Sequence, residues 1–205
     1  MLVTRIEAYN SKQVKIYLDG EFSFVLYKGE LSRYQIREGE QIQPDIYRLL
    51  TEEVLVKRVR LRAMNLLTKR PYTEQGLRSK LREGLYPTWL EDNALAYVKS
   101  FGYIDDTAYA RDYAASLSSR YSLRVIRNKM QQKGIAAQVI ESCLAEMEGQ
   151  LLDQEKDLLD ALIYKKTKGQ IPAEPKERAK LMRFLAGKGF SSESVRNALK
   201  DASDT

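Results

Sequence analysis

The chain has 205 residues, of which 43 % are hydrophobic and 30 % charged, and its formal net charge is +6. This composition predicts one large or two small globular domains and excludes a disordered chain. No segment has the roughly 18 consecutive apolar residues of a membrane helix, and the first residues lack the apolar stretch of a signal peptide. We therefore expect a cytoplasmic protein that does not associate with membranes.

The residue counts also exclude most catalytic chemistry. There is no histidine and one cysteine, Cys143, which excludes histidine-based nucleophile systems, zinc sites and a disulfide framework. Neither a P-loop nor a dinucleotide-binding glycine pattern occurs. A site built from carboxylates alone is the remaining enzymatic alternative, but the acidic residues are scattered or stand at helix ends. We expect a protein that is not an enzyme and uses no metal or cofactor.

The beginning of the chain has the two-residue apolar period of β-strands. Apolar and polar side chains alternate over residues 14–18 and 22–26, on either side of Asp19-Gly20. This arrangement predicts an antiparallel hairpin. Placing every apolar side chain on one face pairs Leu18 with Phe22, which requires a three-residue loop.

The strand pattern gives way to a helical one near Pro44. Further short strands are expected at Val3–Ala8 and Gly39–Ile42, because a hairpin alone is only marginally stable and must pack against something. One long amphipathic helix is predicted over Val54–Lys69. It must end before Pro71, because the residue before a proline is displaced from the helical region.

The rest of the chain contains an internal repeat with offsets of 49 and 55 residues, and each copy reads as three helices. The equivalent positions are an apolar pair in the middle helix (Leu77/Leu81, Ile126/Met130, Leu181/Leu185), the turn residue after it (Leu85, Gly134, Gly189) and a small residue in the third helix (Ala94, Cys143, Ala198). A glycine at the turn can adopt the left-handed conformation that ends a helix. We therefore expect the first turn, which carries Leu85, to be built differently. Cys143 is expected to be an inert core residue.

These patterns predict a mainly α fold of three tandem three-helix repeats forming an elongated curved array, preceded by a small antiparallel β-hairpin unit. The expected domains are residues 1–45 for the hairpin unit, 54–104 for repeat 1, 105–149 for repeat 2 and 153–202 for repeat 3. The opening helices of repeats 2 and 3 are expected at Asp105–Leu117 and Asp153–Thr167.

Positive charge is concentrated in two of the repeats. Residues 57–82 contain nine lysines and arginines against one acid, and no acid occurs from Tyr113 to Ile140. Thirteen tyrosines offer rings that could stack on bases. Several of them, including Tyr97 and Tyr109, have the spacing of core residues instead.

Two basic positions recur in register. Arg78 and Arg127 share one repeat position, and Lys80 and Lys129 share another. A regular array would bring them onto one solvent-facing stripe that binds a polyanion or an acidic protein, and their reversal to glutamate should leave folding intact. Ordinary solvated helix faces are the alternative. The candidate basic surface comprises Arg70, Arg78, Lys80, Arg82, Arg120, Arg124, Arg127, Lys129, Lys133, Lys180 and Arg183.

Four segments resemble the RecX regulatory proteins, which modulate the RecA recombinase. The segments are RPYTEQGLRSKL at Arg70–Leu81, FGYIDDTAYA at Phe101–Ala110, RVIRNKMQQKGI at Arg124–Ile135 and LAGKGF at Leu185–Phe190. Together with the repeat, the resemblance covers roughly residues 55–200. Leu85 at the first turn and Gly76 inside a helix depart from the family pattern.

The resemblance implies a non-enzymatic negative regulator. It implies binding in the groove of the RecA–single-stranded DNA filament, with inhibition of filament extension, ATP hydrolysis, strand exchange and RecA-stimulated repressor cleavage in the SOS response. Single- or double-stranded DNA is implied as a second partner, and we expect a monomer. Two alternatives stay open: an autonomous basic helical DNA-binding module, and a helical adaptor for an unrelated acidic partner.

Overall fold

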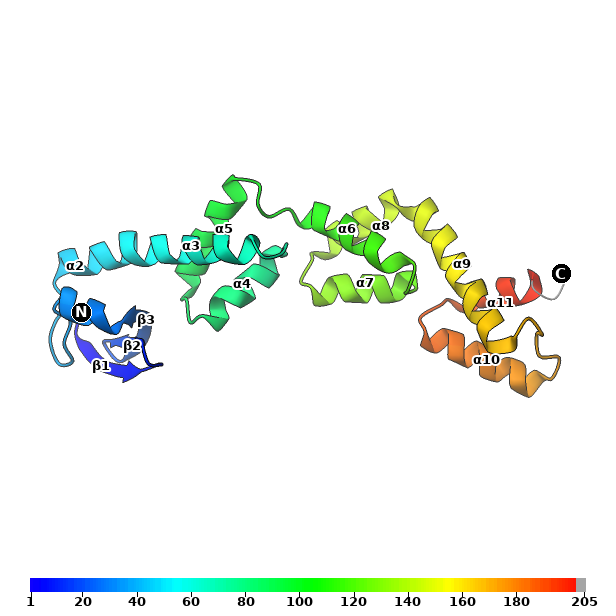
Figure 1. Cartoon of the computed structure of the whole chain (residues 1–205), viewed down its shortest axis with the longest axis horizontal. Helices are drawn as coiled ribbons and strands as arrows, with labels where there is room; N and C mark the ends of the chain where they lie inside the picture. Colours follow the sequence, from blue (N-terminus) through cyan, green and yellow to red (C-terminus); the bar gives the residue numbers. More distant parts are fainter. Residues whose placement is uncertain (202–205) are drawn as a thin grey trace. The chain divides into compact units, whose positions relative to one another are not determined.

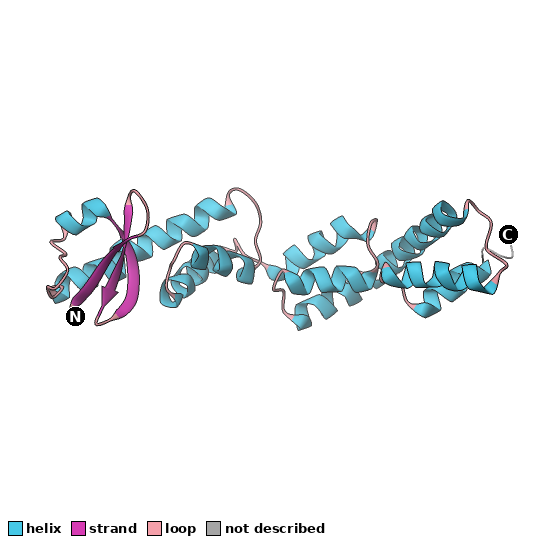
Figure 2. Cartoon of the chain, turned by 90° about the horizontal axis from the view of Figure 1, so that it is seen from below, coloured by secondary structure: helices cyan, strands magenta, loops and turns pink. Residues whose placement is uncertain are grey.

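The computed structural model describes residues 1–201. It is mostly helical, and its strands lie at the N-terminal end (Figures 1 and 2). The chain divides into two compact units, Met1–Asp105 and Asp106–Thr205. Among the residues described, no helix is both long and apolar enough to cross a membrane.

A three-stranded antiparallel sheet in the order β1-β2-β3 opens the first unit. The strands are β1 (Val3–Ala8), β2 (Gln13–Leu18) and β3 (Glu21–Tyr27). The expected additional strand over residues 39–42 is wrong. Only an isolated bridge between Leu2 and Gln41 forms there, because the left-handed backbone of Gly39, with φ 83°, interrupts the extended conformation.

The hairpin turn is shorter than the apolar pattern predicts. Leu18 pairs with Glu21, so the expected pairing of Leu18 with Phe22 is wrong. Both residues of the Asp19-Gly20 turn have positive φ, 48° and 92°, which gives a two-residue turn suited to the twist of a hairpin. A bulge then returns Phe24 to the buried face, while Phe22 stays exposed on the other.

A long helix supports the sheet. The helices of the first unit are α1 (Lys28–Arg33), α2 (Pro44–Arg48), the π-helical segment η1 (Leu49–Val54), α3 (Leu55–Leu67), α4 (Glu74–Glu83) and α5 (Thr88–Ser100). Segments α2, η1 and α3 follow one another without a break (Figure 1). The helix therefore begins at Pro44, earlier than the expected Val54, because proline is well suited to the first turn of a helix.

The sheet and the first three helices of the repeat share one hydrophobic core. Ile16 and Leu26 of the sheet and Leu50 and Val59 of the long helix are all completely buried. Arg58 of α3 adds a polar link, because it pairs with Glu30 and donates a 3.2 Å hydrogen bond to the carbonyl of Val25. The marginal hairpin is thus stabilised by helix α3.

The second unit contains six helices in its described part and two hydrophobic cores. They are α6 (Asp106–Ser118), α7 (Leu123–Gln132), α8 (Ala137–Glu146), α9 (Glu148–Thr167), α10 (Pro175–Gly187) and α11 (Ser192–Asp201). The middle-helix pairs Ile126/Met130 and Leu181/Leu185 are buried, as predicted, and so is Leu77/Leu81 in the first unit. Cys143 is also buried, which raises the pKa of its thiol. Helix α9 begins at Glu148, before the expected Asp153, and follows α8 almost directly.

The turn after each middle helix has the same geometry in all three repeats. Leu85 has φ 58°, beside 75° for Gly134 and 97° for Gly189. The expectation that the Leu85 turn is built differently is therefore wrong, and a leucine adopts a conformation that normally favours glycine. At the preceding Gly84, a Cβ atom would lie 3.1 Å from the Leu81 carbonyl oxygen and from the Tyr86 ring, so a side chain there would be tightly packed.

The turn at Gly189 also joins the two cores of the second unit. The Ser122 hydroxyl donates a 3.1 Å hydrogen bond to the Lys188 carbonyl, and Glu155 accepts one of 2.9 Å from the Leu123 amide at the start of α7. Burial raises the pKa of Glu155, and the Leu123 hydrogen bond acts in the opposite direction. A Cβ atom at position 189 would overlap Ser122 Oγ and approach Val125 Cγ2 to 2.8 Å. Only glycine fits this junction.

Replacement of two neighbouring glycines by alanine should therefore change the free energy of unfolding in opposite directions. Gly189→Ala should lower the free energy of unfolding by about 1–3 kcal/mol, because the left-handed backbone and the Ser122 contact both oppose a side chain. Gly187→Ala should raise it by about 0.5 kcal/mol, because the site is open and helical. Urea denaturation followed by circular dichroism measures both. Equal effects would contradict this assignment of the turn.

Candidate interaction surface

The predicted basic residues divide according to whether an acidic side chain within the same unit neutralises them. Arg78 and Arg127, which share a repeat position, both connect the second helix of their repeat to the third. Arg78 Nη1 lies 2.6 Å from Asp92 Oδ1, and Arg127 Nη2 lies 2.9 Å from Glu141 Oε2. In each case the acidic partner is 14 residues downstream. We call these two ion pairs the arginine clamps.

The clamp in the first unit is the less exposed of the two. The Arg78 side chain is 21 % exposed, so the expectation that it faces solvent is wrong, whereas Arg127 is 46 % exposed. Hydrogen bonding to Asp92 raises the pKa of the Arg78 guanidinium above its ordinary value. Arg78 also lies 3.9 Å from Glu74. Its charge therefore serves contacts inside the first unit.

A buried carboxylate explains why two of the arginines of this unit are retained by the fold. Glu91 is 1 % exposed and occupies the repeat position that Ile140 fills in repeat 2 and Val195 in repeat 3, both buried. Its two oxygens accept hydrogen bonds of 3.2 and 3.0 Å from Arg82, and Arg78 approaches to 3.5 Å. Because a charge at a core position must be paired, Arg82 and Arg78 neutralise Glu91.

The two lysines that share a repeat position make different contacts. Lys80 Nζ lies 2.7 Å from Glu83 Oε2 on the same helix. Lys129 Nζ lies over the Tyr121 ring, 4.6 Å from its centroid. In repeat 3 the same position is Phe184, which packs against the core. A cation at this position is therefore not a constant feature of the repeat.

The other predicted cations lie at the surface. Arg70, Arg120, Arg124 and Arg183 are exposed and form no ion pair with any residue from 1 to 201. Arg70 lies over the Tyr72 ring, and Lys133 over the Tyr113 ring. Arg120 donates a 3.0 Å hydrogen bond to the Ser116 carbonyl. Lys180 is 3.8 Å from Glu177, with 71 % of its side chain exposed.

Helix α7 presents the most continuous polar face of this set. Its exposed residues Arg124, Arg127, Asn128 and Gln131 follow the spacing of one helix side, and we call them the α7 face. Between Tyr113 and Ile140 the chain has no acid, so Glu141 is the carboxylate that partly neutralises this face. Arg120 stands just before α7. The face suits an acidic or polyanionic partner.

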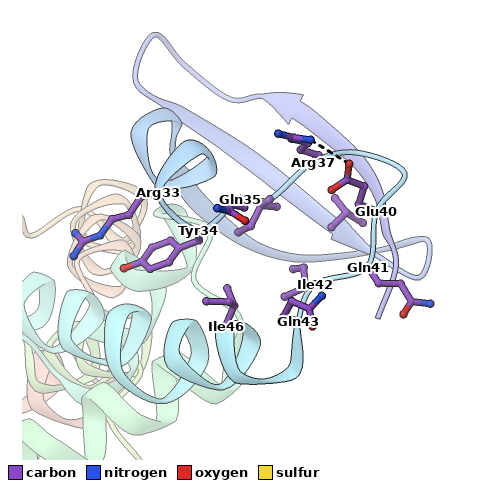
Figure 3. A pocket seen from close by; sticks show the side chains of 11 residues that line it. Arg33, Tyr34, Gln35, Arg37, Glu40, Gln41, Ile42, Gln43 and Ile46 are labelled. Carbon is purple, nitrogen blue, oxygen red and sulfur yellow. Dashed lines mark ion pairs between the residues drawn. The ribbon is translucent and has the colours of Figure 1, made fainter.

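A cavity of about 400 Å³ lies elsewhere in the first unit, between the segment after α1 and the start of α2 (Figure 3). Ile46 points from α2 toward the segment that carries Gln35, and Arg37 and Glu40 pair at 3.5 Å on the rim. Val3, Ile36 and Ile42 are its buried apolar lining. No periodic signal in the sequence marks this cavity, because it forms where separate segments pack.

Charge reversal should distinguish the two clamps. Arg78→Glu should lower the free energy of unfolding by about 3 kcal/mol or more, because it adds a carboxylate beside the buried Glu91 and beside Asp92. Arg127→Glu should cost no more than about 1 kcal/mol, because its ion pair is exposed. Urea unfolding of both variants measures the difference. An Arg78→Glu variant as stable as the wild type would show that the cluster around Glu91 is misassigned.

Two family models match the second half of the chain, and full-length relatives match nearly all of it. The model of the second three-helix domain of RecX matches residues 105–144, and that of the third three-helix domain matches residues 153–199. A regulatory protein RecX of Caldanaerobacter subterraneus subsp. tengcongensis is 25 % identical over 201 residues, covering 97 % of this chain and 98 % of the relative. One from Serratia proteamaculans is 29 % identical over 164 residues, covering 68 % and 95 %.

Solved structures agree with these matches. A crystal structure of a regulatory protein RecX is 25 % identical, with a TM-score of 0.64 and 98 % of each chain covered. RecX from Lactobacillus salivarius shares the fold at 17 % identity, with a TM-score of 0.63 over 74 % of this chain and 99 % of that one.

Proposed function

The chain belongs to the RecX family of regulatory proteins, and on this premise we propose that it is a non-enzymatic negative regulator of the RecA recombinase. It binds in the groove of the RecA–single-stranded DNA filament as a monomer. Binding there blocks filament extension and suppresses ATP hydrolysis, strand exchange and RecA-stimulated repressor cleavage.

The observation that carries this proposal is the α7 face. It offers the unpaired Arg124 and two amides on one side of a helix, beside the ion-paired Arg127 and just after the exposed Arg120. Its buried side is fixed by Ile126 and Met130, so the helix presents this face in one orientation before the partner arrives. Such pre-organisation reduces the entropy that binding must overcome.

The repeated architecture supports action on a filament. Each three-helix repeat has its own buried middle-helix pair and can present its own outer surface. Several weak contacts on one chain reinforce one another through effective concentration when the target is a regular polymer. We assign the partner contacts to the exposed cations Arg120, Arg124, Lys133, Lys180 and Arg183, with Arg70 in the first unit. Arg78 and Arg82 are assigned to the fold.

Reversal of exposed arginines should weaken inhibition without unfolding the protein. The double variant Arg120→Glu, Arg124→Glu should raise the concentration needed to halve RecA-dependent ATP hydrolysis on single-stranded DNA by roughly tenfold, because like charges would then face an acidic partner. The matched control is the double variant Lys156→Glu, Lys165→Glu, which changes the net charge equally at two exposed lysines of helix α9 in the same unit. Its inhibition should equal that of the wild type.

The alternative outcomes are informative. Equal loss in both variants would indicate a dependence on net charge alone and would contradict the assignment to the α7 face. Failure of the wild-type protein to slow RecA at any ratio would contradict the proposed function itself. Circular dichroism spectra of the two variants serve as the check on folding.

A further inference from the structure

Three aromatic side chains form a continuous group at the end of helix α5. The Tyr97 and Phe101 rings meet edge to face, with centroids 5.0 Å apart. The Phe101 and Tyr103 rings are stacked at 5.8 Å, with an angle of 21° between their planes. We call Tyr97, Phe101 and Tyr103 the aromatic step. Two of its three rings are therefore nearly parallel.

The outer part of the aromatic step is not core. Phe101 is 57 % exposed and Tyr103 is 51 % exposed, whereas Tyr97 packs partly against the hydrophobic core. The expected core role thus holds for Tyr97, the innermost ring. Exposed aromatic side chains that lie against one another are typical of an interaction site.

The backbone holds these rings in place. Gly102 has φ 68°, which turns the chain between the two exposed aromatics. The Gly102 amide donates to the Lys99 carbonyl at 2.9 Å, and the Tyr103 amide donates to the Val98 carbonyl at 3.0 Å. These bonds close the end of helix α5, and the next residue, Ile104, is buried. The aromatic step is therefore a fixed surface and not a loose loop.

Unneutralised cations lie in the same unit. Arg60 of α3 stacks over Tyr97 at 4.6 Å and donates a 2.8 Å hydrogen bond to Asn93. Other exposed cations of α3 and the residues after it make no ion pair with the described residues, namely Lys57, Arg62, Lys69 and Arg70. A ligand that carries both planar rings and negative charge would match the first unit on both counts.

We propose that the aromatic step is a stacking platform for unpaired nucleobases, so that the first unit binds single-stranded nucleic acid. Exposed aromatic rings stack on bases irrespective of sequence, and basic groups nearby contact the phosphates. A double helix does not fit, because its bases are already stacked and cannot reach Phe101 or Tyr103. The site is separate from the α7 face and does not depend on the proposed action on RecA.

The test measures binding of two fluorescent oligonucleotides to the full-length protein by anisotropy. One is oligo(dT), and the other is an abasic strand of equal length, which keeps the phosphates and lacks the bases. The variant is Phe101→Leu, Tyr103→Leu, which retains apolar side chains but removes the aromatic faces. Phe101→Trp is the conservative variant. Tyr164→Leu is the matched control, because Tyr164 is a 69 % exposed aromatic of the second unit.

The double leucine variant should bind oligo(dT) at least about fivefold more weakly than the wild type, because each stacked base is lost. Both proteins should bind the abasic strand equally, and the slope of affinity against salt should stay the same, because the phosphate contacts remain. Phe101→Trp and Tyr164→Leu should bind oligo(dT) like the wild type.

Several results would overturn the proposal. One is equal wild-type affinity for oligo(dT) and the abasic strand, which would restrict binding to phosphates. Another is unchanged oligo(dT) binding by the double leucine variant. If that variant also lost its inhibition of RecA, the aromatic step would be a protein-docking surface instead. Unchanged RecA inhibition with weakened oligo(dT) binding supports the platform and leaves the function proposed for the α7 face intact.

Discussion

Each repeat depends on the burial of two side chains one helical turn apart on its middle helix. These are the pairs Leu77/Leu81, Ile126/Met130 and Leu181/Leu185, and all six side chains are almost completely buried. Their removal from water lowers the free energy of the folded repeat. Because this burial fixes the rotation of the helix, it also decides which side chains point to the neighbouring helix and which point outward. The division between structural and available cations follows from that rotation.

The residue directly after the first member of each pair shows this consequence. In repeats 1 and 2 it is an arginine that clamps the third helix, at Arg78 and Arg127. In repeat 3 it is Met182, which packs against the core. The position therefore joins two helices by an ion pair in repeats 1 and 2 and packs against the core in repeat 3. A recurring arginine is here a sign of repeated structure, and Arg124, which is unpaired and does not recur, is the better candidate for contact with a partner.

Much of this architecture is visible in the sequence, because helical periodicity and the repeat reinforce each other. The buried pairs and the burial of Cys143 were predictable from apolar spacing, and the strand over Val3–Ala8 from the need of a hairpin for further support. The arginine clamps could also have been predicted from the sequence, because Asp92 and Glu141 share a repeat position just as Arg78 and Arg127 do. The unusual site of Glu91 was predictable too, because the other repeats have the apolar residues Ile140 and Val195 at its position.

Other features depend on tertiary context that no local pattern carries. The hairpin turn is one residue shorter than the apolar alternation implies. The bulge in β3 compensates for this and places Phe24 on the buried face. Leu85 adopts a left-handed backbone because the surrounding repeat imposes the turn geometry that glycines adopt elsewhere. The exposure of Phe101 and Tyr103 likewise depends on the hydrogen bonds that end helix α5. Helical spacing alone does not predict whether these two side chains are buried or exposed.

The central claim is that clamped arginines serve the fold while unpaired arginines meet the partner. Arginine-selective chemical modification with phenylglyoxal, read by mass spectrometry with and without the RecA–single-stranded DNA filament, tests it most directly. The account predicts that Arg124 reacts readily in the free protein and becomes protected on the filament, whereas Arg78 reacts slowly in both. Reaction of Arg78 as fast as that of Arg124 in the free protein, or no protection of Arg124 by the filament, would contradict it.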